Sequence, residues 1–366
     1  MIKKLDKYIF KQVLAASIVC LLLFVVVWIA PETLFKVMKR TLEGIYTPSV
    51  GMQLLICEFP KILSKALPVG MLLGALFVFD TLSKNFELTV MRSVGVSFWR
   101  IISPVIVLSV FFTVICFVVY DKWIPVSAVK LNFLKNEYNS SHFVYAINRD
   151  NGLPKQTVII SSYDKNYIRD LKVLDFADTE HEETSIIKDI MIAEYADVVD
   201  DGWKLKNVKK YNISKEGVFE NIQNLDSVKI FDKDISNKVF TLMINSLKRD
   251  REFTNSELRE YINLLNSENL KEESNFMLNK YLQRYFHSII CILFAILGCI
   301  LGFSQPREQR LIGFTIAIAI IFAYYITLPF FDLLAEKGIL LPLISASIQP
   351  IAIAVLIYFL KKIKDL

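Results

Sequence analysis

The sequence predicts an α-helical membrane protein with six transmembrane helices and an inserted antiparallel β-domain. Hydrophobic residues make up 54% of the 366 residues, and the mean hydropathy is +0.42, both high for a soluble protein. The long apolar runs lie before about residue 120 and after about residue 285. The segment between them is polar and contains strand-like patterns, so we expect a folded domain outside the membrane.

Three spans are predicted in the first part of the chain, at about residues 9–30, 52–82 and 98–120. The first could instead be a secretory signal peptide, but its apolar stretch exceeds the roughly 7 to 15 residues of such a segment, so we favour a retained helix. The second contains Pro60 and Pro68 and is expected to bend, because proline removes a helical hydrogen bond.

Three further spans are predicted at about residues 285–303, 311–331 and 341–360. Lys and Arg concentrate in the N-terminal segment, the 83–100 and 304–310 loops, and the C-terminal tail. Because cytoplasmic loops are enriched in these residues, both termini should be cytoplasmic and the middle segment should lie across the membrane. No repeat relates the first three spans to the last three, so a pseudo-symmetric partner would have to be another chain.

The middle segment, residues 126–267, is rich in β-branched and aromatic residues that partly alternate with polar ones. Strands are predicted at residues 157–163, 168–176, 185–199, 203–213 and 227–231. Asp200, Asp201 and Gly202 provide a turn between two of them. Thr254 and Glu257 have the spacing of a capping box, which predicts a helix leading back to the membrane. The resulting domains are residues 1–125, 126–267 and 268–366.

The sequence offers no enzymatic motif. A phosphate-binding loop needs a Gly-Lys pair, which the chain lacks, so it should not hydrolyse ATP itself. His181-Glu182-Glu183 lacks the second His of a zinc motif and is interpreted as a solvated turn, while His287 lies alone in a span. We therefore expect no cofactor in this chain. The net charge of +5 gives no support for a nucleic-acid partner.

The cysteines are expected to act as small buried hydrophobic residues, since all five lie in apolar segments. They are Cys20, Cys57, Cys116, Cys291 and Cys299.

Several charges lie in or beside the spans, where charges are costly. Lys61 and Lys65 are one turn apart in the second span, beside Glu58. Three more cations follow the first span on its outer side: Lys36, Lys39 and Arg40. They could reach toward lipid headgroups, with Glu58 paired to Lys61. Alternatively, they could form a basic rim that binds the phosphates of an anionic amphiphile. Composition alone favours the first alternative.

The loop between the second and third spans contains a predicted short helix at about residues 84–97. Phe86, Val90 and Val94 would lie on one side of it, with Glu87 and Met91 adjacent. Two further positions mark its end: Gly95 would stop the helix, and Ser97 could cap the next one. The helix is either an interfacial amphipathic helix without a partner or a docking helix for a cytoplasmic protein, anchored by Glu87.

The run "ELTVMRSVGVS", residues 87–97, resembles a signature of the LptF/LptG permeases, the membrane subunits of the lipopolysaccharide exporter. Further similarities follow in the same order as in that family: "LDKYI" at residues 5–9, "FPKILSKALPVGMLLGAL" at 59–76, Trp-Ile-Pro at 123–125, "AEYADVVDDGWKLKNV" at 193–208, Pro-Arg-x-x-Arg at 306–310, and Gly338, Pro342 and Pro350. These features are more similar to LptG than to LptF. One difference is Arg284 and Ser288 where many members have Lys and Pro.

The resemblance implies six helices with a periplasmic β-jellyroll, in a multi-pass protein of the bacterial inner membrane. It implies that the short helix is a coupling helix that docks on the ATPase LptB, which would carry the ATP and magnesium. The coupling residues would be Glu87, Phe86, Met91, Arg92 and Gly95. Lys39, Arg40 and Lys61 match basic positions that face the lipid, and this raises the basic-rim interpretation above headgroup contact. Lys36 and Lys65 join this lipid-binding set by proximity.

By this resemblance, the chain would be a permease subunit that extracts lipopolysaccharide from the membrane and passes it to a periplasmic bridge. Its partners would be a homologous LptF/LptG subunit, LptB and an LptC-like periplasmic protein. Two alternatives stay open: a membrane scaffold or signalling protein whose β-domain binds a periplasmic partner, and an ATP-coupled export permease for another cargo.

Overall fold

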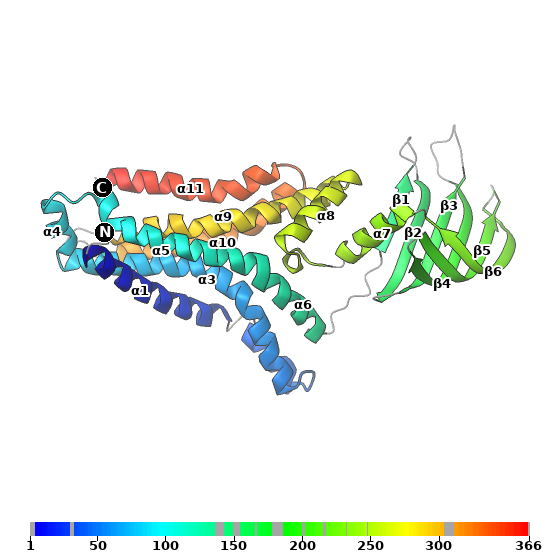
Figure 1. Ribbon diagram of the computed structural model, residues 1–366, viewed down its shortest axis with the longest axis horizontal. Helices are drawn as coiled ribbons and strands as arrows, with labels where there is room; N and C mark the ends of the chain where they lie inside the picture. The colour runs from blue at the N-terminus through cyan, green and yellow to red at the C-terminus, as the bar shows by residue number, and fades with distance from the viewer. Residues whose placement is uncertain are drawn as a thin grey trace. The chain divides into compact units, whose positions relative to one another are not determined.

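The computed structural model describes residues 4–29, 33–135, 143–148, 154–164, 167–177, 186–199, 202–214, 217–231, 233–246, 248–303 and 311–364. The chain forms two compact units (Figure 1). The helical unit comprises Met1–Glu137 and Asp250–Leu366, and the β unit comprises Tyr138–Arg249.

Within the described residues, six helices are long and apolar enough to cross a membrane, as predicted. The main helices are α1 (Lys4–Ile29), α3 (Pro48–Lys84), α5 (Phe98–Val118), α9 (Lys271–Gly302), α10 (Leu311–Glu336) and α11 (Pro342–Ile363). The shorter ones are α2 (Phe35–Leu42), α4 (Glu87–Ser93), the π-helical turn η2 (Val119–Trp123), α6 (Ile124–Lys135), the 3-10 turn η3 (Asp250–Glu252) and α8 (Asn255–Ser267). Thr254 and Glu257 form the expected capping box at the start of α8.

Two helices extend well beyond the predicted spans. The third continues from α5 through η2 into α6 and ends at Lys135, inside the segment that the sequence assigned to the β-domain. Pro125 lies directly after the π-helical turn η2, where the hydrogen-bond register of the helix already changes, so it does not stop the helix. The fourth begins at Lys271, well before the predicted start at about residue 285. The first half of α9 is polar but contributes buried residues, and a hydropathy window does not detect such a helix.

The centre of the helical unit is α3, which packs closely against α1 and α9. Gly70 and Gly74 of α3 face α1, whereas Gly298 and Gly302 of α9 face α3. A Cβ atom on Gly302 would lie 2.5 Å from the carbonyl oxygen of Leu76, closer than packed atoms can approach. Two glycine pairs at four-residue spacing therefore allow three backbones to meet, as is usual between membrane helices.

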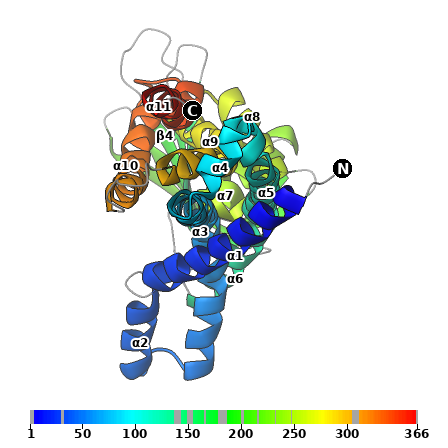
Figure 2. The same cartoon turned by 90° about the vertical axis from the view of Figure 1, so that its left-hand side faces the viewer.

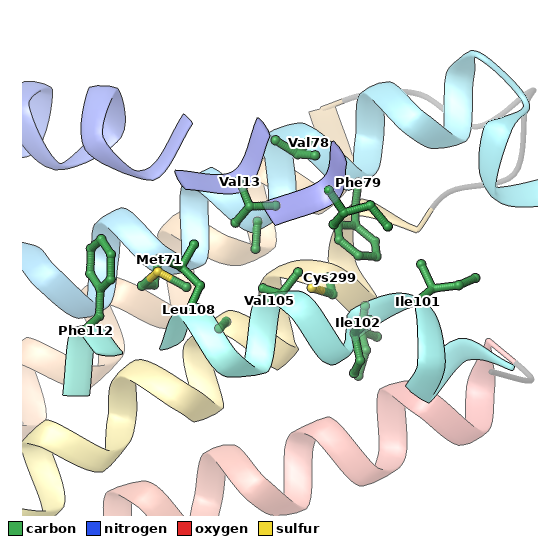
Figure 3. Close-up of a cluster of buried hydrophobic side chains, with 14 of the residues drawn as sticks. Val13, Met71, Val78, Phe79, Ile101, Ile102, Val105, Leu108, Phe112 and Cys299 are labelled. Carbon is green, nitrogen blue, oxygen red and sulfur yellow. The ribbon is translucent and has the colours of Figure 1, made fainter. Parts of the chain in front are cut away.

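A buried apolar cluster fills the space between α1, α3, α5 and α9 (Figure 3). It includes Val13, Met71, Val78, Phe79, Ile101, Ile102, Val105, Leu108, Phe112 and Cys299. All five cysteines of the chain are buried free thiols, which confirms their predicted role as small hydrophobic residues.

A proline interrupts the hydrogen bonding of α3 at the level of this core. Pro68 has no N–H, so the carbonyl oxygen of Ser64 lacks its helical donor. The imidazole of His287 replaces that donor: Nε2 lies 3.3 Å from the Ser64 oxygen, and Nδ1 lies 2.6 Å from the hydroxyl of Tyr324. Because a carbonyl only accepts, Nε2 carries the proton and Nδ1 accepts from the tyrosine. His287 thus joins α9 to α3 one turn before Pro68.

The described residues of the β unit form one antiparallel sheet in which the strands pair in chain order. The strands are β1 (Phe143–Asn148), β2 (Pro154–Asp164), β3 (Tyr167–Phe176), β4 (Ile187–Val199), β5 (Gly202–Ile213) and β6 (Phe219–Ile230). This confirms the antiparallel β-domain. The turn residues Asp200 and Asp201 lie outside the described residues, and Gly202, with φ +138°, opens β5.

The sequence prediction did not include β1 or the helix α7 (Lys233–Ser246) of the β unit. Among the described side chains of α7, Val239, Leu242 and Met243 are buried, a helical spacing that the sequence does contain. Val239 and Met243 belong to the same buried cluster as the fully buried Trp203.

Candidate functional site

The chain reverses direction between α2 and α3 and brings a set of cations together. Gly44 has φ +75° and follows α2, and Thr47 and Pro48 then begin α3 as N-cap and first helical residue. Gly51 of α3 faces α2, and a Cβ there would lie only 3.2 Å from the side chain of Val37. Figure 2 shows the resulting pair, α2 beside the first half of α3.

A cavity of about 460 Å³ opens at this pair of helices and is completed by the ends of α6 and η3. Its basic side chains are Lys36, Lys39, Arg40, Lys61, Lys135 and Arg251. Two carboxylates, Glu43 and Glu58, also line it, and Val37, Leu54 and Leu131 supply apolar wall. The cavity therefore combines a surplus of positive charge with apolar surface.

The buried carboxylate of Glu58 organises one wall of the cavity. It lies 3.9 Å from the ammonium of Lys61 and 3.8 Å from that of Lys135. The Glu58–Lys61 pair predicted from the sequence is thus present. On the other wall, Arg40 donates to the hydroxyl of Tyr46 at 2.7 Å. These contacts position several cationic groups at the cavity. Because six cations and two carboxylates line it, the cavity keeps a net positive charge.

The structure brings together four of the five predicted lipid-binding residues. Lys36, Lys39, Arg40 and Lys61 line the cavity. Lys65 lies elsewhere on α3, with its ammonium 4.9 Å from the ring centre of Trp28 on α1.

Two cavity residues, Lys135 and Arg251, were missed from the sequence. Both lie in segments that were assigned to the outer domain. The helical spacing of the buried Ala128 and Leu131 is the signal that could have placed Lys135 on an extension of the third span.

The predicted coupling helix is shorter than expected. The helix α3 ends at Lys84, and Phe86 adopts a left-handed conformation with φ +60° before α4 begins. Phe86 therefore precedes the helix instead of sharing a helical stripe with Val90 and Val94, although all three are more than half exposed. Gly95, with φ +84°, follows the helix as predicted.

The polar residues of this segment contact several helices. The carboxylate of Glu87 accepts from the hydroxyl of Tyr8 on α1 at 3.2 Å. The guanidinium of Arg92 lies 5.4 Å from the ring centre of Phe303, at the end of α9. Met91 is partly buried against the apolar core. One further prediction is wrong: Ser97 occupies the N-cap of α5, but its side chain makes no capping hydrogen bond.

Arg284 and Ser288, which differ from the Lys and Pro of many family members, do not interrupt α9. The Ser288 hydroxyl donates to the Arg284 carbonyl at 2.8 Å within a continuous helix. The buried guanidinium of Arg284 donates to the carbonyl oxygens of Phe253 at 3.0 Å and Asp250 at 2.8 Å. It therefore fixes the segment through which the chain returns from the β unit.

Among the described residues, no group of three or more His, Cys, Asp or Glu side chains could hold a metal ion. His181, Arg307 and Arg310 lie outside those residues.

Residues 7–362 match the family model described as lipopolysaccharide export system permease LptF/LptG. The match includes both the helical unit and the β unit. It describes LptF and LptG together, so the greater similarity to LptG stays a prediction. A search of curated proteins found no match.

Proposed function

This chain belongs to the LptF/LptG family of lipopolysaccharide export permeases, and on that premise we propose that it is one membrane subunit of an ATP-driven exporter. In this proposal, the exporter extracts lipopolysaccharide from the inner membrane and delivers it to a periplasmic bridge. The chain is a membrane permease subunit, and the ATPase is a separate protein.

The basic cavity between α2, α3 and α6 is the observation that supports lipid binding by this chain. Lipopolysaccharide has phosphate groups on a lipid anchor, so its binding site needs cations beside apolar surface. Lys39, Arg40 and Lys61 supply donors for charge-assisted hydrogen bonds to phosphate. The apolar residues Val37 and Leu54 line the same space. We propose that the phosphates bind to these cations during extraction.

The exposed part of the 86–95 segment is proposed to bind the ATPase, LptB. Phe86, Val90 and Val94 expose 52%, 59% and 78% of their surface, so they form an apolar patch on the loop between two spans. Glu87 supplies a charge at the start of α4. ATP and magnesium would bind to the partner, and closure of the ATPase dimer would displace α4.

The remaining partners are proposed from the family. A second LptF/LptG subunit would pair with this chain, and an LptC-like protein would receive the lipid from the β unit. The distribution of Lys and Arg favours cytoplasmic termini and a periplasmic β unit.

The lipid site can be tested by reversing Lys39, Arg40 and Lys61 to Glu together in the purified exporter and measuring crosslinking to lipopolysaccharide. A matched control reverses three exposed cations that do not line the cavity, Lys122, Lys271 and Lys337. We expect the first variant to lose crosslinking and the control to keep it. Equal crosslinking in the two variants would disprove the site and favour a scaffold.

A further inference from the structure

The first turns of α1 are bonded to both ends of the segment that contains α4. The Asp6 carboxylate accepts from Arg100 Nη2 at 2.8 Å, and Arg100 lies in the first turn of α5. The Tyr8 hydroxyl donates to the Glu87 carboxylate at 3.2 Å, at the start of α4. Two polar side chains from one stretch of α1 thus contact position 87, at the start of the proposed ATPase-binding segment, and position 100, just beyond its end.

Helix geometry explains how neighbouring residues reach two separate elements. Positions two apart lie on nearly opposite sides of an α-helix, so Asp6 and Tyr8 flank a face of α1 that carries Leu5 and Ile9. Ile9 is fully buried in the same apolar cluster as Leu88 of α4. The helices α1 and α4 therefore also share one buried apolar cluster.

The same contacts orient the proposed docking residue. Asn85 donates to the Glu87 carboxylate at 3.4 Å, in addition to the bond from Tyr8. Leu88 is only 1% exposed, so α4 cannot rotate on its own axis without exposing it. A displacement of α4 must therefore either break these bonds or move α1 with it.

We propose that Asp6 and Tyr8 are positioning residues that transmit displacement of α4 into α1. This proposal rests on the proposed function, because it assumes that the ATPase binds at α4. The helix α1 leads along the chain to α2, which carries Lys36, Lys39 and Arg40 of the basic cavity. The residues thus couple α4 to α1 directly, in addition to the covalent connection from α3 to α4.

The first test measures hydrogen exchange of the backbone amides of residues 88–94 in the full-length protein in detergent, without nucleotide. The variants are Asp6→Ala and Tyr8→Phe, which remove the two polar contacts, and the matched control is Tyr358→Phe, a residue 65% exposed on α11. Since partly exposed polar pairs contribute modestly, we expect exchange to rise about twofold to fivefold in each test variant and not in the control. Unchanged exchange in both test variants would overturn the positioning role.

The second test measures lipopolysaccharide released per ATP hydrolysed by the reconstituted exporter. Asp6→Arg should lower this ratio about threefold or more while ATP hydrolysis continues, and adding Arg100→Asp should restore it by reversing the ion pair. A structural defect alone would reduce hydrolysis and release together. An unchanged ratio in Asp6→Arg, or no recovery in the double variant, would overturn the transmission.

The two tests also separate this proposal from the proposed function. If the unmodified exporter released no lipopolysaccharide on ATP addition, the proposed function would fail. The exchange measurement would then still decide whether Asp6 and Tyr8 position α4.

Discussion

The Nε2 atom of His287 lies 3.3 Å from the carbonyl oxygen of Ser64, the acceptor that Pro68 deprives of its helical donor. A residue of α9 thereby completes the hydrogen bonding of α3 across a helix interface. An unsatisfied buried carbonyl costs more than a typical hydrogen bond contributes, so this contact offsets the cost of Pro68 in the most enclosed of the candidate membrane spans.

Replacement of His287 by Leu should therefore lower the free energy of unfolding by about 1–3 kcal/mol, because, among the described residues, the Ser64 carbonyl then keeps only the weak thiol donor of Cys116, 3.7 Å away. In a Pro68→Ala background the helix regains the N–H of residue 68, so the same replacement should cost less. A double-mutant cycle in detergent measures the difference. Additive effects would show that His287 stabilises the fold through packing alone.

Gly298→Ala should separate α9 from α3. The added Cβ would meet the backbone carbonyl of Leu72, which cannot move without shifting the helix. We expect a loss of about 1–3 kcal/mol, measured by thermal unfolding in detergent. The matched control is Ala319→Val on the exposed face of α10. A loss in the control as large as in Gly298→Ala would indicate that added volume in any span is harmful.

Glu87→Arg should abolish co-purification with the ATPase, because it reverses the charge proposed to anchor docking. Glu87→Gln removes the charge but keeps an oxygen that can accept from Tyr8, so it separates docking from the internal hydrogen bond. We expect Glu87→Gln to weaken co-purification and to leave thermal stability unchanged. Glu260→Arg, an exposed position on α8, should bind the ATPase normally. Normal binding by Glu87→Arg would reject the docking role.

Arg284→Met should loosen the segment at residues 250–254 that precedes α8. The carbonyl oxygens of Asp250 and Phe253 would lose their donors, at a cost of about 2–4 kcal/mol to local stability. Limited proteolysis should then cut this segment faster. Arg284→Lys keeps the charge but cannot reach both carbonyls with a planar fork, so its rate should be intermediate. Unaltered proteolysis of Arg284→Met would mean that the contacts of α8 suffice to hold the segment.

The sequence predicts the spans well because a membrane helix must be continuously apolar, and the β-domain because strand patterns survive in isolation. It fails where a helix mixes polar residues with buried ones, as in the first half of α9 and in α6. This failure hides Lys135 from the predicted basic set. Proximity in the sequence places Lys65 in the predicted lipid-binding set. In the structure, its ammonium instead lies over the ring of Trp28 on α1.

Contacts between residues that are distant in the sequence could not be predicted either. The "LDKYI" motif marks the family, but it does not reveal the contacts of Asp6 with Arg100 and of Tyr8 with Glu87. Those contacts depend on how α1, α4 and α5 pack. Local patterns specify each element, whereas the side chains that meet between elements depend on tertiary structure.

The central claim, that this permease subunit binds lipopolysaccharide at its basic cavity, is tested most directly by native mass spectrometry of the purified exporter. We predict a bound species with the mass of lipopolysaccharide in the unmodified complex and its loss when Lys39, Arg40 and Lys61 are reversed to Glu. A complex that carries no lipopolysaccharide, or that retains it after the reversal, would contradict the claim.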